Sequence, residues 1–235
     1  MTDSLPLGQP RRRLASLAGL VFALVIPAVL SAGGPGELPA EASAVGSILM
    51  NEAAIWGLTL AVLAIVLFWE RRPLRSIGLG RPSWEALRFG AMLTVGLMVL
   101  ATLAAATVEL LGLPIQDDGQ AQLIMGLPIW VQLFVVLSAG FTEEVLFRGY
   151  AIERMTELTG SRWLGAIVPI VVFGGVHAPF WGIGHALVAG MTGLWLTLIY
   201  LWRRNLWTNI AAHALLDGAV FVIMDIASAT GTVTT

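Results

Sequence analysis

The sequence predicts an all-α, polytopic transmembrane helical bundle, and three observations lead to this fold class. Hydrophobic residues occupy 57% of the 235 positions, charged residues only 12%, and the mean hydropathy is +0.83, which is unusual for soluble domains. The apolar residues gather in about seven runs, each close to the length that crosses a bilayer. None of these runs alternates with polar residues as barrel strands do, so the runs are expected to be helices.

The predicted spans follow one another without a linker or a shift in composition, which indicates a single membrane domain over residues 1–235. Their approximate ranges are 14–32, 45–69, 86–111, 127–150, 163–180, 183–202 and 206–228. Arginines mark alternate segments between the spans, beginning with the tail at 1–13. Because basic loops stay in the cytoplasm, we expect a multi-pass protein of a cell inner membrane with a cytoplasmic N-terminal tail and an outside C-terminus.

The first apolar run has a second interpretation. Arginines precede it and the small residues "ASA" at 42–44 follow it, as in a secretory signal peptide. The run is long for a signal core and lies far from that cleavage site, so a retained span is the favoured prediction.

Six ionisable residues lie within the last four predicted spans, where charge is costly. They are Glu143, Glu144, Arg148, His177, His213 and Asp217. On insertion scales a charged side chain at the bilayer centre costs about 2.5–3.5 kcal/mol. These side chains are therefore expected to meet one another or to carry function.

Helical spacing sorts these residues into pairs. Glu144 and Arg148 are four apart and share a face, whereas Glu143 is turned by about 100° from Glu144. Arg148 can therefore neutralise Glu144 and leave Glu143 free for chemistry, although a plain ion cluster at a helix end is an equal alternative. His213 and Asp217 are also four apart, and could polarise a carbonyl, orient an imidazole, bind a metal, or form a hydrogen-bonded core pair.

Depth in the bilayer gives a further prediction. At about 1.5 Å per residue, Glu143 reaches the depth of His177 and His213 only if its helix continues beyond Arg148 through "YAIERM" to about Met155. We predict that continuation. Two other polar residues are expected outside the site, His185 as an interfacial residue after a turn and Glu52 at a solvated border.

Three ordered motifs carry a resemblance to a known family. They are "EEVLFR" at 143–148, "FGGVH" at 173–177 and "HALLD" at 213–217. Together they resemble EExxxR, FxxxH and HxxxN or HxxxD of the CPBP family, also called the ABI family. This family groups CAAX prenyl endopeptidases with bacterial relatives linked to bacteriocin processing and immunity. The resemblance covers residues 125–225, which would form the catalytic core of a membrane peptidase.

The resemblance also implies roles for seven residues. Glu143 would activate a water together with His177, and His213 and Asp217 would stabilise the oxyanion. Glu144, Arg148 and Phe173 would hold the site together. Asp217 departs from the CAAX proteases, which have asparagine there. An ionised aspartate repels an oxyanion, so Asp217 would have to be protonated or would act by orienting His213.

The residue pattern leaves several functions open. The leading hypothesis is an intramembrane endopeptidase that uses a glutamate-activated water and no metal or other cofactor. Covalent catalysis by serine or cysteine is disfavoured, because "GxSxG" and cysteine are absent. Two histidines and a carboxylate also match catalytic zinc, although "HExxH" is missing. A non-catalytic scaffold or immunity protein and a proton-coupled transporter are further alternatives.

The partners expected from the sequence are the lipid bilayer and a peptide or membrane-protein substrate. The net charge of −2 and the lack of a basic face argue against nucleic acid. The oligomeric state is left open by the sequence.

Overall fold

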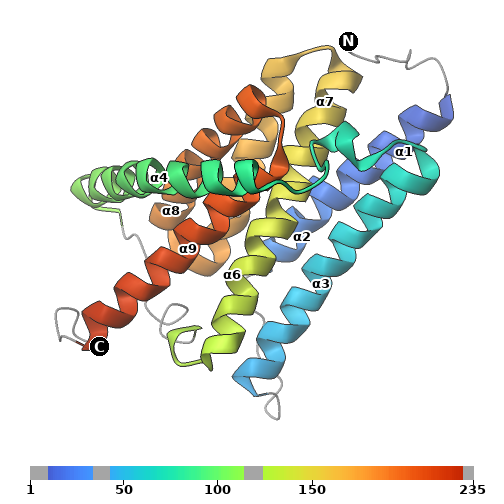
Figure 1. The fold of residues 1–235 in the computed structure, drawn as a ribbon. Coiled ribbons are helices and arrows are strands. Elements are labelled where there is room, and N and C mark those ends of the chain that lie inside the picture. The colour runs from blue at the N-terminus through green and yellow to red at the C-terminus, as the bar shows by residue number, and fades with distance from the viewer. Residues whose placement is uncertain (1–9, 34–42, 114–123, 230–235) are drawn as a thin grey trace.

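The computed structural model describes residues 10–33, 43–113 and 124–229, and within these ranges every regular element is a helix. Six of the helices are long and apolar enough to cross a membrane. This confirms the all-α membrane bundle (Figure 1). Three of the six helices are composite. The first consists of α1 (Pro10–Leu20), η1 (Val21–Val25) and α2 (Ile26–Ala32), the second of α3 (Ala44–Ala64) and η2 (Ile65–Trp69), and the fourth of α6 (Ile129–Glu143), η4 (Glu144–Ala151) and α7 (Ile152–Thr159). The other three are α4 (Trp84–Leu110), α8 (Arg162–Arg203) and α9 (Leu206–Ala229). A short 3₁₀ helix, η3 (Leu74–Ile77), precedes α4.

Helix α8 contains both of the spans that the sequence places at 163–180 and 183–202. Its backbone leaves the helical conformation at Gly182, where φ is 81° and ψ is 167°, values that only glycine adopts readily. The two halves then pack against each other, because a Cβ on Gly174 would lie 3.2 Å from the Cα of Gly190. With each half counted as a crossing, the fold agrees with about seven spans.

The helix that carries the first motif is continuous over 31 residues, from Ile129 to Thr159. The predicted continuation beyond Arg148 to about Met155 is therefore confirmed. Its middle section, η4, is a π-helix of eight residues, and all eight are buried. Such π-helical turns are rare in proteins, and those that do occur are often located at functional sites. The helix ends at Gly160, which has a φ of 69°.

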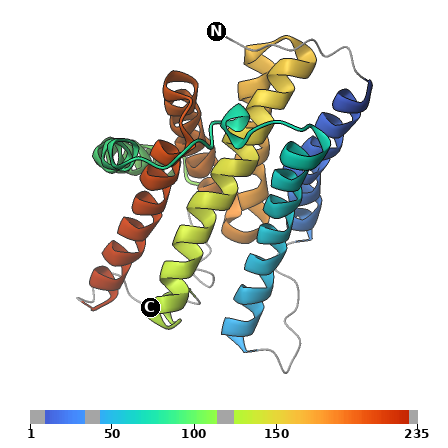
Figure 2. The ribbon, with the colours of Figure 1, turned by 45° about the vertical axis from the view of Figure 1, so that its right-hand side comes forward.

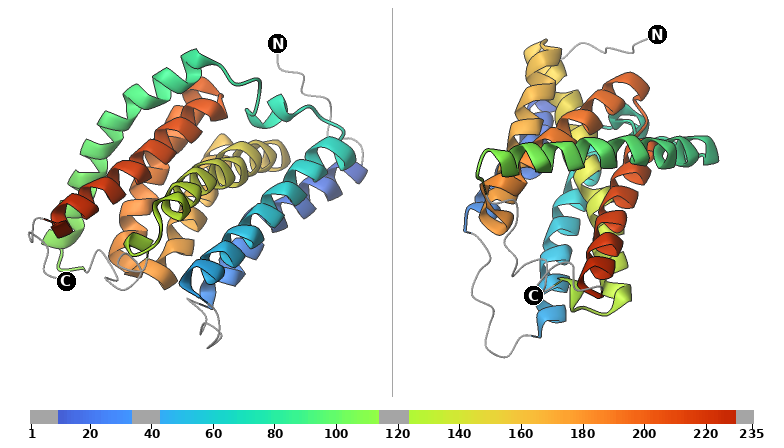
Figure 3. Two further views of the ribbon diagram at one scale, coloured as in Figure 1. Left: turned by 60° about the horizontal axis from the view of Figure 1, so that its bottom comes forward. Right: turned by 90° about the vertical axis from the view of Figure 1, so that its left-hand side faces the viewer.

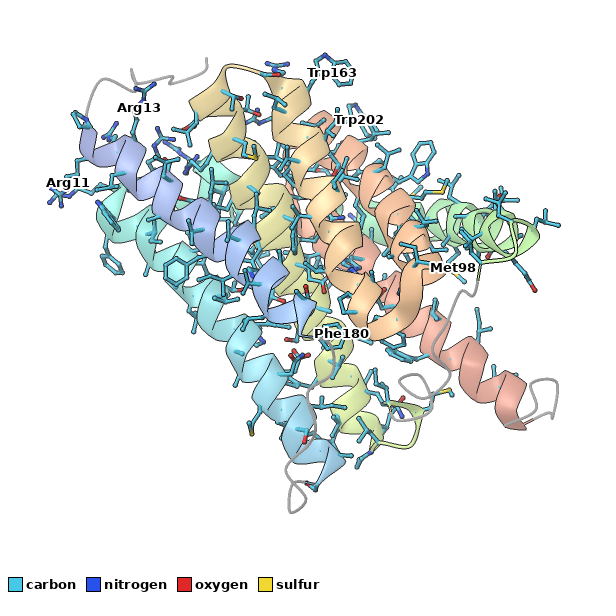
Figure 4. The ribbon with its side chains drawn as sticks, turned by 180° about the vertical axis from the view of Figure 1, so that it is seen from behind. Arg11, Arg13, Met98, Trp163, Phe180 and Trp202 are labelled. Carbon is cyan, nitrogen blue, oxygen red and sulfur yellow. The ribbon has the colours of Figure 1, made fainter. Side chains whose placement is uncertain are left out.

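Most of the arginines gather at one end of the bundle, which we call the arginine end. Figure 4 shows Arg11, Arg13, Trp163 and Trp202 toward this end, with Phe180 near the bend of α8 well away from them. The turn between α7 and α8 and the start of α9 lie at the same end, while α6 starts at the opposite one (Figures 1 and 2). The basic segments along the chain thus lie at the arginine end, and the described residues of the segments that alternate with them lie toward the opposite end.

A buried ion pair fixes α7, the last part of the helix that carries the first motif, at the arginine end. Both carboxylate oxygens of Glu70 accept from Arg154 Nε, at 3.0 and 2.9 Å, and Arg154 Nη2 lies 2.7 Å from Glu70 Oε2. Tyr150 and Ser16 also donate to Glu70, at 2.9 and 3.1 Å. Gly19 lets α1 approach, since a Cβ there would lie 2.0 Å from the Tyr150 oxygen. The first apolar segment thus packs as part of the bundle.

Helix α4 lies across the other helices on one side of the bundle. Figure 2 shows it nearly end-on, whereas α6 and α9 run from top to bottom, and Figure 3 shows it beside α9. The contact is close at Gly90, where a Cβ would lie 2.4 Å from the carbonyl oxygen of Thr208. Helix α9 is therefore held between α4 and α6, and its inner face meets η4.

Candidate active site

Glu144 lies at the centre of a polar cluster between η4 and α9. Its side chain is fully buried. Its Oε1 accepts from Arg148 Nη1 at 3.0 Å and from His213 Nδ1 at 2.9 Å, and its Oε2 accepts from Asn209 Nδ2 at 3.0 Å. A buried charge is tolerated only when it is paired and hydrogen-bonded, and three donors meet that requirement here. Glu144 therefore fastens α9 to the first motif.

Arg148 is held from its other side by an aromatic ring on α8. Its Cζ lies 3.9 Å from the centroid of Phe173, in a cation–π contact. Phe147 packs edge-on against the same ring at 5.2 Å. Gly193 leaves room for this arrangement, since a Cβ there would lie 2.8 Å from the Phe173 ring and 3.0 Å from Arg148 Nη2. Phe173 and Arg148 thus connect the second motif to the first.

Glu143 points to the opposite side of His213 from Glu144. Its Oε2 lies 3.8 Å from His213 Nε2, and Asp217 Oδ2 lies 3.5 Å from the same nitrogen. Glu143 makes no hydrogen bond with any residue that the structure describes, and its side chain is 21% exposed. Because Glu144 can only accept, His213 Nδ1 donates to it and Nε2 faces the other two carboxylates. The spacing argument that separates Glu143 from Glu144 agrees with this geometry.

His177 joins the cluster through Phe173. Its Nδ1 donates to the carbonyl oxygen of Phe173 at 2.6 Å, which leaves Nε2 available to another group. The His177 ring is 4.9 Å from that of Phe173, which in turn is 6.2 Å from that of His213. Among the described carboxylates none forms an ion pair with His177. The three motifs meet, with Glu143 Oε2 3.8 Å from His213 Nε2, and the described side chains of Glu143 and His177 form no ion pair with each other.

The bend at Gly182 brings His185 back beside His177. The two imidazoles are 5.9 Å apart, and Trp181 stacks on His185 at 5.0 Å. The sequence analysis expects His185 at the interface, apart from the site. In the structure it is half-buried and adjoins the second motif, because the turn folds the chain back on itself.

Two further contacts were not expected from the sequence. Glu52 is 5% exposed and accepts from the Ser138 hydroxyl, whose oxygen also accepts from Trp56 Nε1 at 2.7 Å. The expectation of a solvated border for Glu52 is therefore wrong, because α3 packs this side chain against α6. Asn209 donates to Glu144 and, at 2.8 Å, to the carbonyl oxygen of Leu196.

A signal in the sequence could have revealed Asn209. It lies four residues before His213, which lies four residues before Asp217, so the three form a polar stripe along one face of α9. No comparable local signal marks Glu52, because its partner is on another helix.

The described part of the chain contains no group of three or more His, Asp or Glu residues placed to hold a metal ion. Nδ1 of His213 is bonded to Glu144 and Nδ1 of His177 to a backbone carbonyl, which leaves the Nε2 atom of each imidazole without a hydrogen bond among the described residues. Histidines that bind a metal through Nε2 are oriented in the same way, so these two bonds do not decide between the metal-free and the zinc hypotheses.

Comparison with known proteins identifies the family. Residues 125–219 match the family described as type II CAAX prenyl endopeptidase Rce1-like, and the match includes all three motifs. Over this segment, the chain is a member of the Rce1-like family. The family consists of peptidases, so this member is a hydrolase, and its apolar helices make it an intramembrane protease. Comparisons with curated proteins and with solved structures give no significant match.

Proposed function

We propose that this Rce1-like protein is an endopeptidase in which Glu143 activates a water for attack on a peptide carbonyl. The observation that carries the proposal is the contrast between adjacent carboxylates. Glu144 is fully buried and satisfied by three donors, whereas Glu143 is partly accessible and faces His213 Nε2 without a hydrogen bond. A general base needs a carboxylate that is free to take a proton, and Glu143 meets that need.

His177 would hold the same water from the other side. Its Nδ1 is occupied by the carbonyl of Phe173, so its Nε2 is the atom that can accept from or donate to a ligand. A water bridging Glu143 and His177 fits the lack of a direct contact between them. Peptide hydrolysis would then begin with proton transfer from this water to Glu143 as the oxygen attacks the carbonyl carbon. Glu143 would return the proton to the amide nitrogen as the C–N bond breaks, which releases the amine and leaves a carboxylic acid on the other product.

The tetrahedral oxygen would receive a hydrogen bond from His213. Glu144 fixes the imidazole through Nδ1, and a proton on Nε2 would point toward the reacting carbonyl. We propose that Asp217 acts as a positioning residue through His213, whose Nε2 is 3.5 Å from Asp217 Oδ2. In this role an ionised aspartate favours a protonated imidazole and need not contact the oxyanion itself.

We further propose the cellular setting from the distribution of charge. The arginine end would face the cytoplasm in a cell inner membrane, with residues 1–13 as a cytoplasmic tail, of which 1–9 lie outside the described residues. The substrate would be a peptide or a membrane protein, and the prenyl group in the family description is not assumed for this chain. Residues 1–235 would act as one membrane domain with its catalytic core at 125–225.

Substrate trapping in native membranes tests the proposal. Glu143→Gln keeps the shape of the side chain but removes the base, so cleavage should fall by about 10²-fold or more while substrates stay bound. Glu109→Gln, on the exposed face of α4, is the matched control and should cleave like wild type. A Glu143→Gln protein that cleaves normally would refute the mechanism. A second outcome would replace catalysis with a binding role. In that outcome the wild type cleaves nothing, and the Glu143→Gln protein produces the same cellular phenotype as the wild type.

A further inference from the structure

Two adjoining hollows lie at the arginine end, on the outside of α1 and η2. The larger is a shallow, widely open depression of about 380 Å³, lined by Arg11, Ala64, Ile65, Phe68 and Trp69. The smaller has a volume of about 120 Å³ and shares Arg11 and Trp69 with it, adding Arg12, Glu70 and Arg71. One hollow is therefore mainly apolar and the other is lined by charged side chains. None of these residues belongs to the three motifs.

The smaller hollow carries unpaired positive charge. Arg11, Arg12 and Arg71 form no ion pair with any acidic residue in the described part of the chain. Glu70 does not balance them, because it is 1% exposed and its carboxylate is taken by Arg154, Tyr150 and Ser16. Three arginines thus line this space, and Glu70, the acidic residue among its described lining, is already neutralised. Such a space favours an anion.

The neighbouring hollow specifies what kind of anion fits. Phe68 is 75% exposed, and with Ala64 and Ile65 it forms an apolar wall directly beside the arginines. Trp69 lines both hollows, and tryptophan favours the boundary between headgroups and acyl chains. A free phosphate would use only the charged hollow. A phospholipid would fill both, with its phosphate at the arginines and the start of an acyl chain along the apolar wall.

We propose that these hollows, lined by α1 and η2, bind an anionic phospholipid such as phosphatidylglycerol. The site joins two separate spans, so a bound lipid links the first membrane helix to the end of the second. Its floor is Glu70, which Arg154 connects to the helix that carries Glu143. The buried carboxylate beneath the arginines is thus held in place by residues of the protein itself.

Native mass spectrometry of the full chain in neutral detergent tests the proposal with added phosphatidylglycerol or phosphatidylcholine. The triple variant Arg11→Gln, Arg12→Gln, Arg71→Gln should lose about 100-fold in affinity for phosphatidylglycerol, at roughly fivefold per arginine. The control triple Arg75→Gln, Arg81→Gln, Arg162→Gln removes the same charge from exposed positions outside the hollows, and should change the affinity by less than about twofold.

Several outcomes would overturn the site. Equal losses in the two triples would mean diffuse attraction to a basic surface. Equal binding of phosphatidylcholine would mean that the arginines do not select the headgroup, and competition by inorganic phosphate would indicate a free anion site. If the first triple fails to fold, as judged by near-ultraviolet circular dichroism, Arg71→Gln alone should still weaken phosphatidylglycerol binding by about fivefold. An unchanged affinity in that variant would also refute the proposal.

Discussion

The buried Glu144–Arg148 pair allows a quantitative test of how the site is held together. Arg148→Met keeps much of the side-chain volume but removes the charge that faces Glu144 Oε1 at 3.0 Å. Both side chains are almost completely buried, at 0% and 1% exposure. Removing one partner of such a pair leaves an uncompensated charge, which costs about 3–5 kcal/mol of unfolding free energy.

The double variant Glu144→Gln, Arg148→Met separates this cost from lost packing. Both variants lose the contact of Arg148 with Phe173, but only the single variant strands a carboxylate. The double variant should therefore be more stable than Arg148→Met by at least about 1 kcal/mol, since Asn209 and His213 then face a neutral amide.

The unfolding free energy is measured by titrating the purified protein with sodium dodecyl sulfate in mixed micelles and following tryptophan fluorescence. Glu85→Gln is the control, because Glu85 is 81% exposed in its ion pair with Arg203, and it should cost less than about 1 kcal/mol. A double variant that is as unstable as the single one, or less stable, would refute the reasoning that Arg148 serves to compensate the charge of Glu144.

Three other substitutions test individual contacts around the site. Gly140→Leu places a side chain against α9, so it should lower the unfolding free energy by about 1–3 kcal/mol and abolish cleavage. Gly96 faces open space, so Gly96→Leu should change neither the melting temperature nor the cleavage rate. Ser138→Ala removes a donor from the buried carboxylate of Glu52 and should lower stability by about 1–3 kcal/mol in the same detergent titration. Asn209→Leu removes one donor from the buried carboxylate of the first motif; a loss of about 1.5–3 kcal/mol is expected, and unchanged thermal melting would contradict the assigned bond.

The sequence predicts the contacts within each helix better than those between helices. The Glu144–Arg148 and His213–Asp217 pairs follow from residues four apart on one face, and both are present at 3.0 and 3.5 Å. The bonds of Glu52 to Ser138 and of Glu70 to Arg154 join residues 84 or more positions apart. Nothing in the local pattern of either partner indicates which other helix will face it.

The sequence by itself determined that this chain is a bundle of membrane helices and that six of its costly polar residues lie in three motifs, because hydropathy and helical periodicity are local properties. Only the tertiary structure decided that the carboxylate of Glu144 is held by three hydrogen-bond donors and that the carboxylate of Glu143 is not. That distinction depends on the close approach of α6 and α9 at Gly140 and on the reversal of α8 at Gly182, which set the distances between side chains from different helices. Electrostatic pairing acts over a few ångströms, so packing between helices fixes the chemistry of the site.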